Sequence, residues 1–441
     1  MNRRRVAALF ALALVVRVAF VLLVERHPAL PSESFISQSV ARQLASAGLF
    51  SDAFFYHHTA TLLARGYGFA SNPGVPTAQW PPLFPFLLSL VYRVTGPHPV
   101  AGELMNAFFG ALTVPLLYLL ALRAFGRLEA TIAALLLAIF PGQLLWPDVL
   151  LSETLYAFLL VGFFALVTIL RRRTWSVLVL GLAIGLVTLA RGEGILLIPA
   201  VIAIWWRELP RVRLLAASAA LAAVAALTVA PWTIRNAIAM DAFVPISTNA
   251  SITLWSGHNP SAKGAQTYAP PSLLRRVHGT GKEREIGESR LLRQEALRYM
   301  RTHPGRELVL IPLKLLNLNR GDSWALEWVN AGNPSERPFG SELTVPVRVV
   351  ADSAYFGLLA ATILSLLVLG RELWRQRVVR GVLVLFAGAL VMYGFVYYGN
   401  YRYRAPLEPL MLLVSAPLLA RLWRLRGAEP ADSGRYARRE G

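Results

Sequence analysis

Long apolar runs recur along this chain of 441 residues, and they restrict its possible folds more than any other feature. A helix needs ~20 largely apolar residues to cross the hydrocarbon core of a bilayer. Hydrophobic residues make up 55% of the chain and charged residues only 16%, which excludes a single soluble core. We therefore predict an all-α, polytopic integral membrane protein with about ten transmembrane helices, at residues 6–24, 104–124, 130–147, 153–170, 175–190, 194–206, 213–231, 350–370, 381–398 and 406–422.

The formal net charge of +19 would suggest a nucleic-acid partner in a soluble protein. Here the basic residues form short clusters between apolar runs, so we expect a lipid bilayer and no nucleic acid. If the "MNRRR" start is cytoplasmic, the alternation of spans makes every short cytoplasmic loop basic, as the positive-inside rule requires. We predict a plasma (inner) membrane protein with both termini cytoplasmic and basic loops at Arg123 and Arg127, 171–173, 207–213, 371–380 and 421–426.

The first apolar run resembles a signal peptide in its basic start, but it is longer than a normal signal core and lacks a small-residue cleavage site. We therefore expect a retained first span. The chain has no cysteine and no zinc-ligand spacing, P-loop or G-x-G-x-x-G motif. No cofactor is indicated.

Two long regions outside the spans complete the predicted organisation. In the first outer loop, 36–44 has helical apolar spacing suited to the membrane surface. In the second, the charged run Lys282–Arg301 predicts a helix within a lid or substrate-facing cap. The predicted divisions are an N-terminal membrane module at 1–231 including the first outer loop at 25–103, a cap region at 232–349, C-terminal membrane helices at 350–426, and a basic cytoplasmic tail at 427–441.

Asp52 opens the stretch "DAFFYHHTATLLARGYGF" and admits two interpretations. Ser51 can cap a helix, Asp52 suits the positive end of the helix dipole, and Gly66 can end the helix, so local structure alone could explain the carboxylate. Alternatively, Asp52 has a chemical role.

The predicted topology places many charged residues at the outer ends of spans. A charged residue at the end of a span costs little free energy, because its side chain reaches headgroups or water. Any one of these residues can therefore be explained without a function. However, arginines there run against the positive-inside trend, and carboxylates accompany them. A pocket with both signs suits a phosphate-bearing substrate, since arginine grips phosphate and a carboxylate accepts a proton. The set comprises Asp52, Tyr56, Asp148, Glu153, Arg191, Glu193, Arg235, Arg402 and Arg404.

Seven segments occur in the order typical of one enzyme family: "DAFFYHHTATLLARGYGF", "WPPLFPFLLSL", "SETLYAFLL", "LARGEG", "PWTIRNA", "FVPISTNASITLWSGHNP" and "YRYRAPLEPLMLL". With them the chain resembles the GT-C membrane glycosyltransferases related to glycosyltransferase family 39. These include protein O-mannosyltransferases, aminoarabinose transferases and the RgtA/B/C/D-like bacterial enzymes. The resemblance implies the GT-C fold and transfer of a sugar from a polyprenyl-phosphate donor to an extracytoplasmic acceptor, which could be a glycan, a lipid or a protein.

The resemblance also implies residue roles. Asp52 would be the general base of an inverting transfer, and Glu153 would be a second catalytic carboxylate residue. Substrate-binding residues would be Tyr56, Arg191, Arg235, Arg402 and Arg404, with Arg404 expected at the headgroup interface. Two departures bear on the first loop, where 25–50 intervene before Asp52 and Trp80 stands where some members have a lysine.

Histidines and turn-forming residues near these motifs keep two interpretations each. His57 and His58 point about 100° apart on a helix. They are expected to hydrogen-bond or face headgroups, although one of them could join Asp52 in holding a divalent cation. The "STN" and "GHN" segments suit turns or sugar hydroxyls.

Two other classes compete with the enzyme. A transporter or lipid flippase would also have many spans and intramembrane charges, but we find no paired repeat, and the charges cluster at one face. A noncatalytic scaffold of the same fold would be favoured by loss of the acids, and both acids are present.

Overall fold

The computed structural model describes residues 3–24, 52–170, 175–329 and 340–427. The predicted surface helix at 36–44, the Ser51 cap, the arginines at 171–173 and nearly all of the basic tail lie outside these residues. Within them the chain is helical apart from one antiparallel hairpin, β1 (Ala70–Asn72) and β2 (Val75–Pro76). The all-α prediction is therefore confirmed except for this hairpin.

Six helices in the described part of the chain are long and apolar enough to cross a membrane. The protein is a multi-pass membrane protein. These helices coincide with predicted spans and comprise α1 (Arg3–Val24), α5 (Pro99–Ala124), α11 (Arg211–Met240), α17 (Gly340–Arg375), α18 (Arg377–Val391) with the π-helical turn Met392–Val396, and the run from α19 (Tyr401–Arg404) through the 3-10 turn Ala405–Leu407 into α20 (Glu408–Gly427).

The predicted count of about ten is too high if length is the criterion. Three predicted spans form apolar helices of fewer than 18 residues, namely α8 (Glu153–Ile169), α9 (Ser176–Ala190), and α10 (Leu197–Trp205) with the preceding 3-10 turn Gly192–Leu196. A fourth, α6 (Arg127–Ile139), is followed at a 50° bend by α7 (Pro141–Leu145) and the turn Trp146–Asp148. Counting this bent pair as one span gives seven.

A buried arginine stabilises the bend. Pro141 has no N–H to continue the hydrogen-bond ladder of α6, so carbonyls at its end need other donors. Arg17 of α1 is 1% exposed and donates to Leu137 O at 3.1 Å and Ala138 O at 3.3 Å. A charged side chain in the middle of an apolar helix thus caps its neighbour.

Small residues allow α9 and α11 to pack closely against each other. A Cβ atom built on Gly181 would lie 2.6 Å from Val224 Cβ, and one on Gly185 would lie 2.4 Å from Thr228 Cβ. Glycines four residues apart on one helix face let two backbones approach closely in a membrane.

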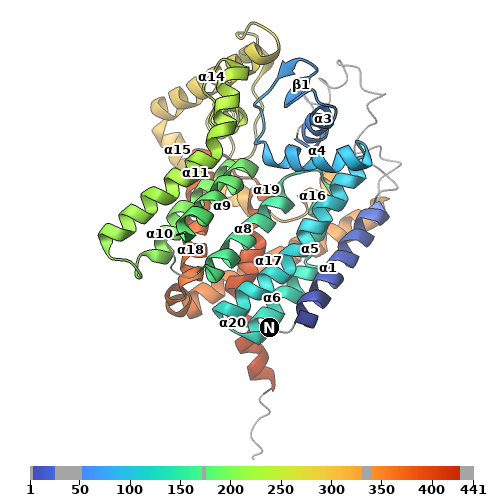
Figure 1. Ribbon diagram of the computed structural model, residues 1–441, viewed down its shortest axis with the longest axis vertical. Helices are drawn as coiled ribbons and strands as arrows, with labels where there is room; N and C mark the ends of the chain where they lie inside the picture. Colours follow the sequence, from blue (N-terminus) through green and yellow to red (C-terminus); the bar gives the residue numbers. More distant parts are fainter. Residues whose placement is uncertain (1–2, 25–51, 171–174, 330–339, 428–441) are drawn as a thin grey trace, which may run out of the picture.

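The remaining elements form a layer at one end of the bundle, remote from the N-terminus, which we call the outer layer after the predicted topology (Figure 1). The charged run Lys282–Arg301, which was predicted to be helical, lies within helix α14 (Gly281–Thr302), so that prediction is confirmed. Glu285 of α14 accepts hydrogen bonds from Thr77 Oγ1 at 2.6 Å, Ala78 N at 3.0 Å and Thr248 Oγ1 at 2.8 Å, which joins the two outer regions. The layer contains α3 (Asp52–Ala64), α4 (Leu83–Thr95), α12 (Asn249–Gly257), α13 (Pro271–Leu274), α14 (Gly281–Thr302), α15 (Pro304–Leu318) and α16 (Trp324–Val329).

Asp52 lies in the first turn of α3, as the helix-dipole interpretation requires. The helix ends at Ala64, and Gly66 has φ of +86°, the left-handed conformation that suits a stop signal. These observations agree with the local role and leave a chemical role open, since both use the same position.

Candidate functional site

The short helix α19 positions two arginines of the "YRYR" sequence. Asn400 caps it by accepting a hydrogen bond from Arg402 N at 2.9 Å. Side chains two residues apart on a helix point about 200° apart, so Arg402 and Arg404 must enter different surroundings.

Arg402 joins two acids that lie far apart in the sequence. Its Nη1 group donates to Asp52 Oδ2 and its Nε group to Glu153 Oε1. Asp52 begins α3 in the outer layer, whereas Glu153 begins the apolar helix α8. The exposed fractions are 8% for Arg402, 9% for Asp52 and 2% for Glu153. The two predicted catalytic carboxylates therefore share one buried guanidinium.

Arg191 extends this cluster on the far side of Glu153. Its guanidinium donates to Glu153 Oε1 at 2.7 Å and to Glu193 Oε1 at 3.4 Å. It also lies over the ring of Tyr403, 5.4 Å from the centroid. Glu193 accepts a further hydrogen bond from Tyr393 at 2.8 Å. Asp52, Arg402, Glu153, Arg191 and Glu193, here called the Arg402 cluster, thus alternate in charge.

Burial makes an arrangement of this kind costly unless every charge has an opposite partner. Charge-assisted hydrogen bonds supply such partners here. One atom is left over, because Glu153 Oε2 has no hydrogen-bond partner among the described residues. An unsatisfied carboxylate oxygen beside two guanidiniums is a place where a substrate hydroxyl could donate.

Tyr56 lies one helical turn from Asp52 and is 3% exposed. Its ring packs against Trp80 and Phe84, with centroids 5.5 and 5.0 Å away. Burial, followed by the charge of Asp52, raises the pKa of Tyr56 above its ordinary value, so its hydroxyl stays protonated and can act as a donor. Trp80, the residue that departs from the family pattern, thus forms an aromatic wall beside the cluster.

Arg235 is not part of the Arg402 cluster. Its guanidinium donates to Phe69 O at 2.5 Å and Thr77 O at 2.6 Å, and it lies 5.0 Å from the Trp232 ring centroid. These bonds hold the hairpin region against the end of α11. Its predicted role in substrate binding stays a prediction, because its donors face backbone carbonyls on both sides of the hairpin.

Arg404 is not at the headgroup interface, and that expectation is wrong. It is 4% exposed and bonds to Glu408 and to Gly321 O, the latter at 2.5 Å. Its guanidinium carbon lies 3.3 Å from the Tyr355 ring centroid. Glu408 also accepts from Gln143 Nε2 at 2.9 Å. The motif places Arg404 near the outer face, but the turn of α19 directs it into the protein.

Asp148 shares the buried surroundings of α8 without joining the cluster. It is 5% exposed, and neither carboxylate oxygen has a hydrogen-bond partner among the residues described. The structure therefore brings together four of the predicted site residues, Asp52, Glu153, Arg191 and Arg402, with Tyr56 directly beside Asp52.

The two adjacent histidines take up hydrogen-bonding positions. His57 Nδ1 lies 2.8 Å from Tyr92 Oη, and His58 Nε2 lies 3.0 Å from Ser71 O. Among described residues, no group of three or more His, Cys, Asp or Glu side chains is disposed to hold a metal ion. In the "GHN" segment Asn259 Oδ1 accepts from Ser261 N at 2.9 Å, which is a turn role.

His258 belongs to a buried cluster that the sequence analysis missed. His258 Nδ1 lies 2.6 Å from Glu307 Oε2, and its Nε2 lies 3.1 Å from Lys314 Nζ. Lys314 is 1% exposed, and burial lowers its pKa to about 8. Burial, followed by the positive charge of Lys314, also lowers the pKa of His258. The available signal was the single lysine in "LVLIPLKLLNL", because a lone charge in an apolar helix usually has a partner.

Comparison with known proteins now bears on this arrangement. Residues 79–235 match the family of dolichyl-phosphate-mannose-protein mannosyltransferases. No curated protein sequence matches the chain. The matched segment contains Glu153, Arg191 and Arg235.

Solved structures give the fold. The apo oligosaccharyltransferase of Archaeoglobus fulgidus is similar with a TM-score of 0.51 and 16% identity, covering 97% of this chain and 52% of that one. The same enzyme tethered to an acceptor peptide gives 0.51 and 16%, covering 98% and 51%. ArnT from Cupriavidus metallidurans bound to undecaprenyl phosphate gives 0.43 and 16%, covering 96% and 79%. The chain spans about half the length of the oligosaccharyltransferases it matches. The predicted resemblance to GT-C membrane glycosyltransferases is confirmed.

Proposed function

We propose that the protein is a GT-C membrane glycosyltransferase that moves a sugar from a polyprenyl-phosphate donor to an acceptor on the outer side of the membrane. The observation that carries the proposal is the single contact point at Arg402, where the acid of the outer layer and the acid of α8 meet. The family matched by residues 79–235 is described by a lipid-phosphate sugar donor, which supports the same donor class.

Asp52 would act as the general base. It lies at the outer-layer end of the Arg402 cluster, where α3 begins. An acceptor hydroxyl approaching from the outer layer would lose its proton to this carboxylate while its oxygen attacks the anomeric carbon. Attack from the face opposite the phosphate inverts the anomeric centre.

Arg402 and Arg191 would bind the donor phosphate. Each can offer a planar set of N–H donors that matches phosphate oxygens, and preorganised donors stabilise charge as it develops on a leaving group. Arg402 would exchange the Asp52 carboxylate for the phosphate, which replaces one anionic acceptor of guanidinium hydrogen bonds by another. This exchange would also free Asp52 for the acceptor.

Glu153 would keep both guanidiniums in place during the exchange. It lies between Arg402 and Arg191 and is almost fully buried, so it holds the spacing of the two cations. Its free oxygen Oε2 could accept a hydrogen bond from a sugar hydroxyl.

An Asp52→Asn variant tests the proposal in a purified transfer assay with a polyprenyl-phosphate sugar. The change preserves shape and removes the proton acceptor, so we expect a loss of transfer rate on the order of 100-fold or more. Asp241→Asn is the matched control, since Asp241 is an exposed carboxylate paired with Lys282 in the same outer layer. Near-normal turnover by folded Asp52→Asn protein would contradict the base assignment.

The same preparation separates an enzyme from a flippase. A flippase moves a lipid-linked sugar between leaflets without cleaving the sugar–phosphate bond. Reconstituted protein that translocates the labelled donor but never releases the free lipid phosphate would refute glycosyl transfer.

A further inference from the structure

A second group of arginines lies at the far ends of α10 and α18, two helices whose other ends lie close in sequence to residues of the Arg402 cluster. Arg191 precedes the turn that leads into α10, and Arg402 follows α18 and its π-helical turn. The far end of α10 leads to Arg207, and the far end of α18 meets the last turns of α17. These far ends enclose a pocket of about 410 Å³ lined by Arg207, Gly370, Arg371, Trp374 and Arg375.

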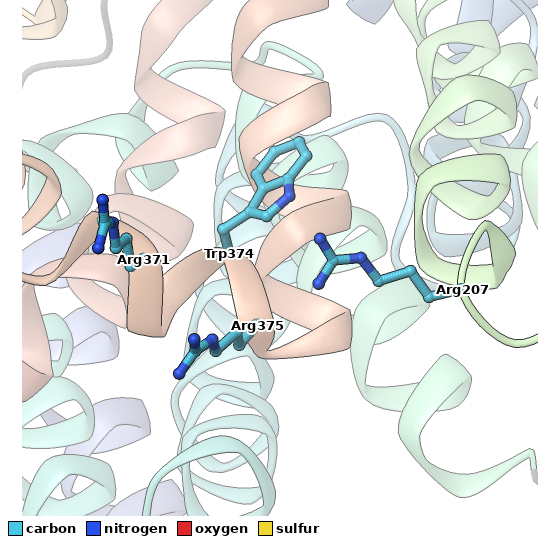
Figure 2. A pocket seen from close by; sticks show the side chains of 5 residues that line it. Arg207, Arg371, Trp374 and Arg375 are labelled. Carbon is cyan, nitrogen blue, oxygen red and sulfur yellow. The ribbon is translucent and has the colours of Figure 1, made fainter.

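An apolar pocket of about 300 Å³ adjoins this basic pocket. Both are lined by Arg207 and Trp374, and the apolar one is completed by Pro199, Ile202, Ala203, Trp206 and Arg380. Figure 2 shows Arg207 extending toward the helix that carries Trp374 and Arg375, with Arg371 farther along that helix. A basic end next to an apolar end suits an amphiphile better than a free ion.

The carboxylates near this pocket are already paired. Glu208 pairs with Arg377 at 3.3 Å, and Glu372 pairs with Arg421 at 2.6 Å. Arg380, which also lines the apolar pocket, donates to Ala203 O at 2.6 Å and caps the end of α10. Its guanidinium is therefore engaged within the protein.

Arg207, Arg371 and Arg375 differ from these residues. Among the ion pairs formed by the described parts of the chain, none involves any of the three. All three are exposed. Three cations thus line one pocket without a paired carboxylate among the described residues, so the pocket presents charge of one sign.

We propose that this pocket binds an anionic phospholipid, with the phosphodiester between Arg207, Arg371 and Arg375 and an acyl chain against Ile202 and Trp206. Guanidiniums favour phosphate oxygens, and basic pockets between membrane helices bind anionic headgroups. Trp374 and Trp206 are 42% and 68% exposed, as expected for aromatic side chains at a membrane interface. The site is distinct from the Arg402 cluster and does not depend on its chemistry.

Titration of the purified protein in neutral detergent with dioleoyl-phosphatidylglycerol, read by native mass spectrometry, tests the site. We expect Arg371→Gln/Arg375→Gln protein to bind this lipid on the order of 10-fold more weakly, since each basic group near a lipid surface contributes to affinity. Arg211→Gln/Arg213→Gln is the matched control. Both arginines are exposed at the start of α11, which follows α10 at the same end of the bundle.

Three outcomes would overturn the proposal. Equal weakening in the two double variants would assign binding to general surface charge. Equal binding of dioleoyl-phosphatidylcholine and dioleoyl-phosphatidylglycerol would remove the role of the anion. If Arg371→Gln/Arg375→Gln weakened binding of undecaprenyl phosphate more than binding of phosphatidylglycerol, the pocket would be a carrier-lipid site. Thermal unfolding without added lipid should be the same for both variants, which excludes a folding defect.

Discussion

Arg402 and Arg404 are two residues apart on α19, yet their surroundings differ in one decisive respect. Arg402 connects α8 to the outer layer through Asp52, which is 9% exposed. Arg404 connects α19 to α20 and to Gly321, and its partners Glu408 and Asp322 are 0% exposed. One cation therefore has a partner that is slightly exposed, whereas the partners of the other are fully buried.

This difference suggests different roles for the two buried arginines, a functional role for Arg402 and a structural role for Arg404. A buried ion pair contributes little net stability. Removing one partner lowers the free energy of unfolding strongly, because the other partner remains buried and charged without compensation. Exchange of partners needs access from outside, and Asp52 is 9% exposed whereas Glu408 and Asp322 are 0% exposed. We therefore expect substitutions at the two arginines to act on different observables.

Arg404→Gln should give the largest effect, and on stability. It leaves Glu408 without its cation, and breaking a buried pair costs roughly 3 to 5 kcal/mol. Equilibrium unfolding by a denaturing detergent in mixed micelles measures this loss of stability. The double variant Arg404→Gln/Glu408→Gln should recover part of it, because the uncompensated carboxylate is then removed. A stable Arg404→Gln protein would remove the distinction between the two arginines.

Lys314 offers a limiting case, because its Nζ bonds to His258 rather than to a carboxylate. Its pKa falls from 10.5 in the unfolded chain to about 8 in the folded protein. Between these values the unfolded state binds more protons, so stability should rise with pH, by on the order of 3 kcal/mol across the whole interval. Below pH 8 the full cost of burying the ammonium is present.

A Lys314→Met variant isolates this effect. The stability of the wild-type protein relative to Lys314→Met should increase as the pH rises from 8 to 10.5, an interval in which His258 is neutral in both proteins. A flat difference across the upper interval would show that the ammonium retains its ordinary pKa.

Arg402→Gln should lower sugar transfer on the order of 100-fold, which corresponds to about 2.7 kcal/mol, since it removes donors aimed at the leaving phosphate. Its effect on unfolding should be smaller than that of Arg404→Gln, because Glu153 keeps Arg191 and Asp52 is near the surface. Transfer rates at matched protein level provide the measurement. Unlike the Arg404 double variant, Arg402→Gln/Asp52→Asn should recover no activity.

Arg235→Gln should have the smallest effect. Its guanidinium bonds to two hairpin carbonyls, and loss of hydrogen bonds to a charged group costs roughly 1 to 3 kcal/mol when the acceptors are buried and less when water replaces the donor. We expect faster proteolysis near the hairpin with nearly normal donor affinity. A large increase in donor KM with unchanged proteolysis would instead place Arg235 in the binding site.

The sequence predicted well where the apolar helices lie along the chain. All ten predicted spans coincide with helices, because apolar periodicity and length are local properties. The helices α8 and α9 are each one residue shorter than their predicted spans, and α10 begins only at Leu197 because Gly192–Leu196 forms a 3-10 turn. The break at Pro141 was not predicted, although a proline inside an apolar helix is a local signal for one. Its cap Arg17 could not be predicted, because it lies more than a hundred positions away.

For the candidate site, the sequence predicted residues but not their partners. Asp52, Glu153, Arg191 and Arg402 were selected from motifs, and the structure brings them together. Arg404 has the same motif and the same helix end, so only the direction of its side chain separates it from Arg402. Lys314 and His258 lie on segments without a shared motif, and their contact requires the tertiary packing of α15 against the loop after α12.

The short helices at the site have a consequence for the lipid around it. With 17 and 15 residues, α8 and α9 rise about 26 and 22 Å, less than the ~30 Å of bilayer hydrocarbon. Glu153 begins α8 and Arg191 follows α9, so both lie at the same end of this short pair. A bilayer accommodates such hydrophobic mismatch by thinning. The lipid next to the cluster would be drawn inward, which lowers a carrier phosphate toward the guanidiniums without lifting its tail from the leaflet. For the proposed transferase, bilayer thickness would then be a determinant of how readily the donor reaches its site.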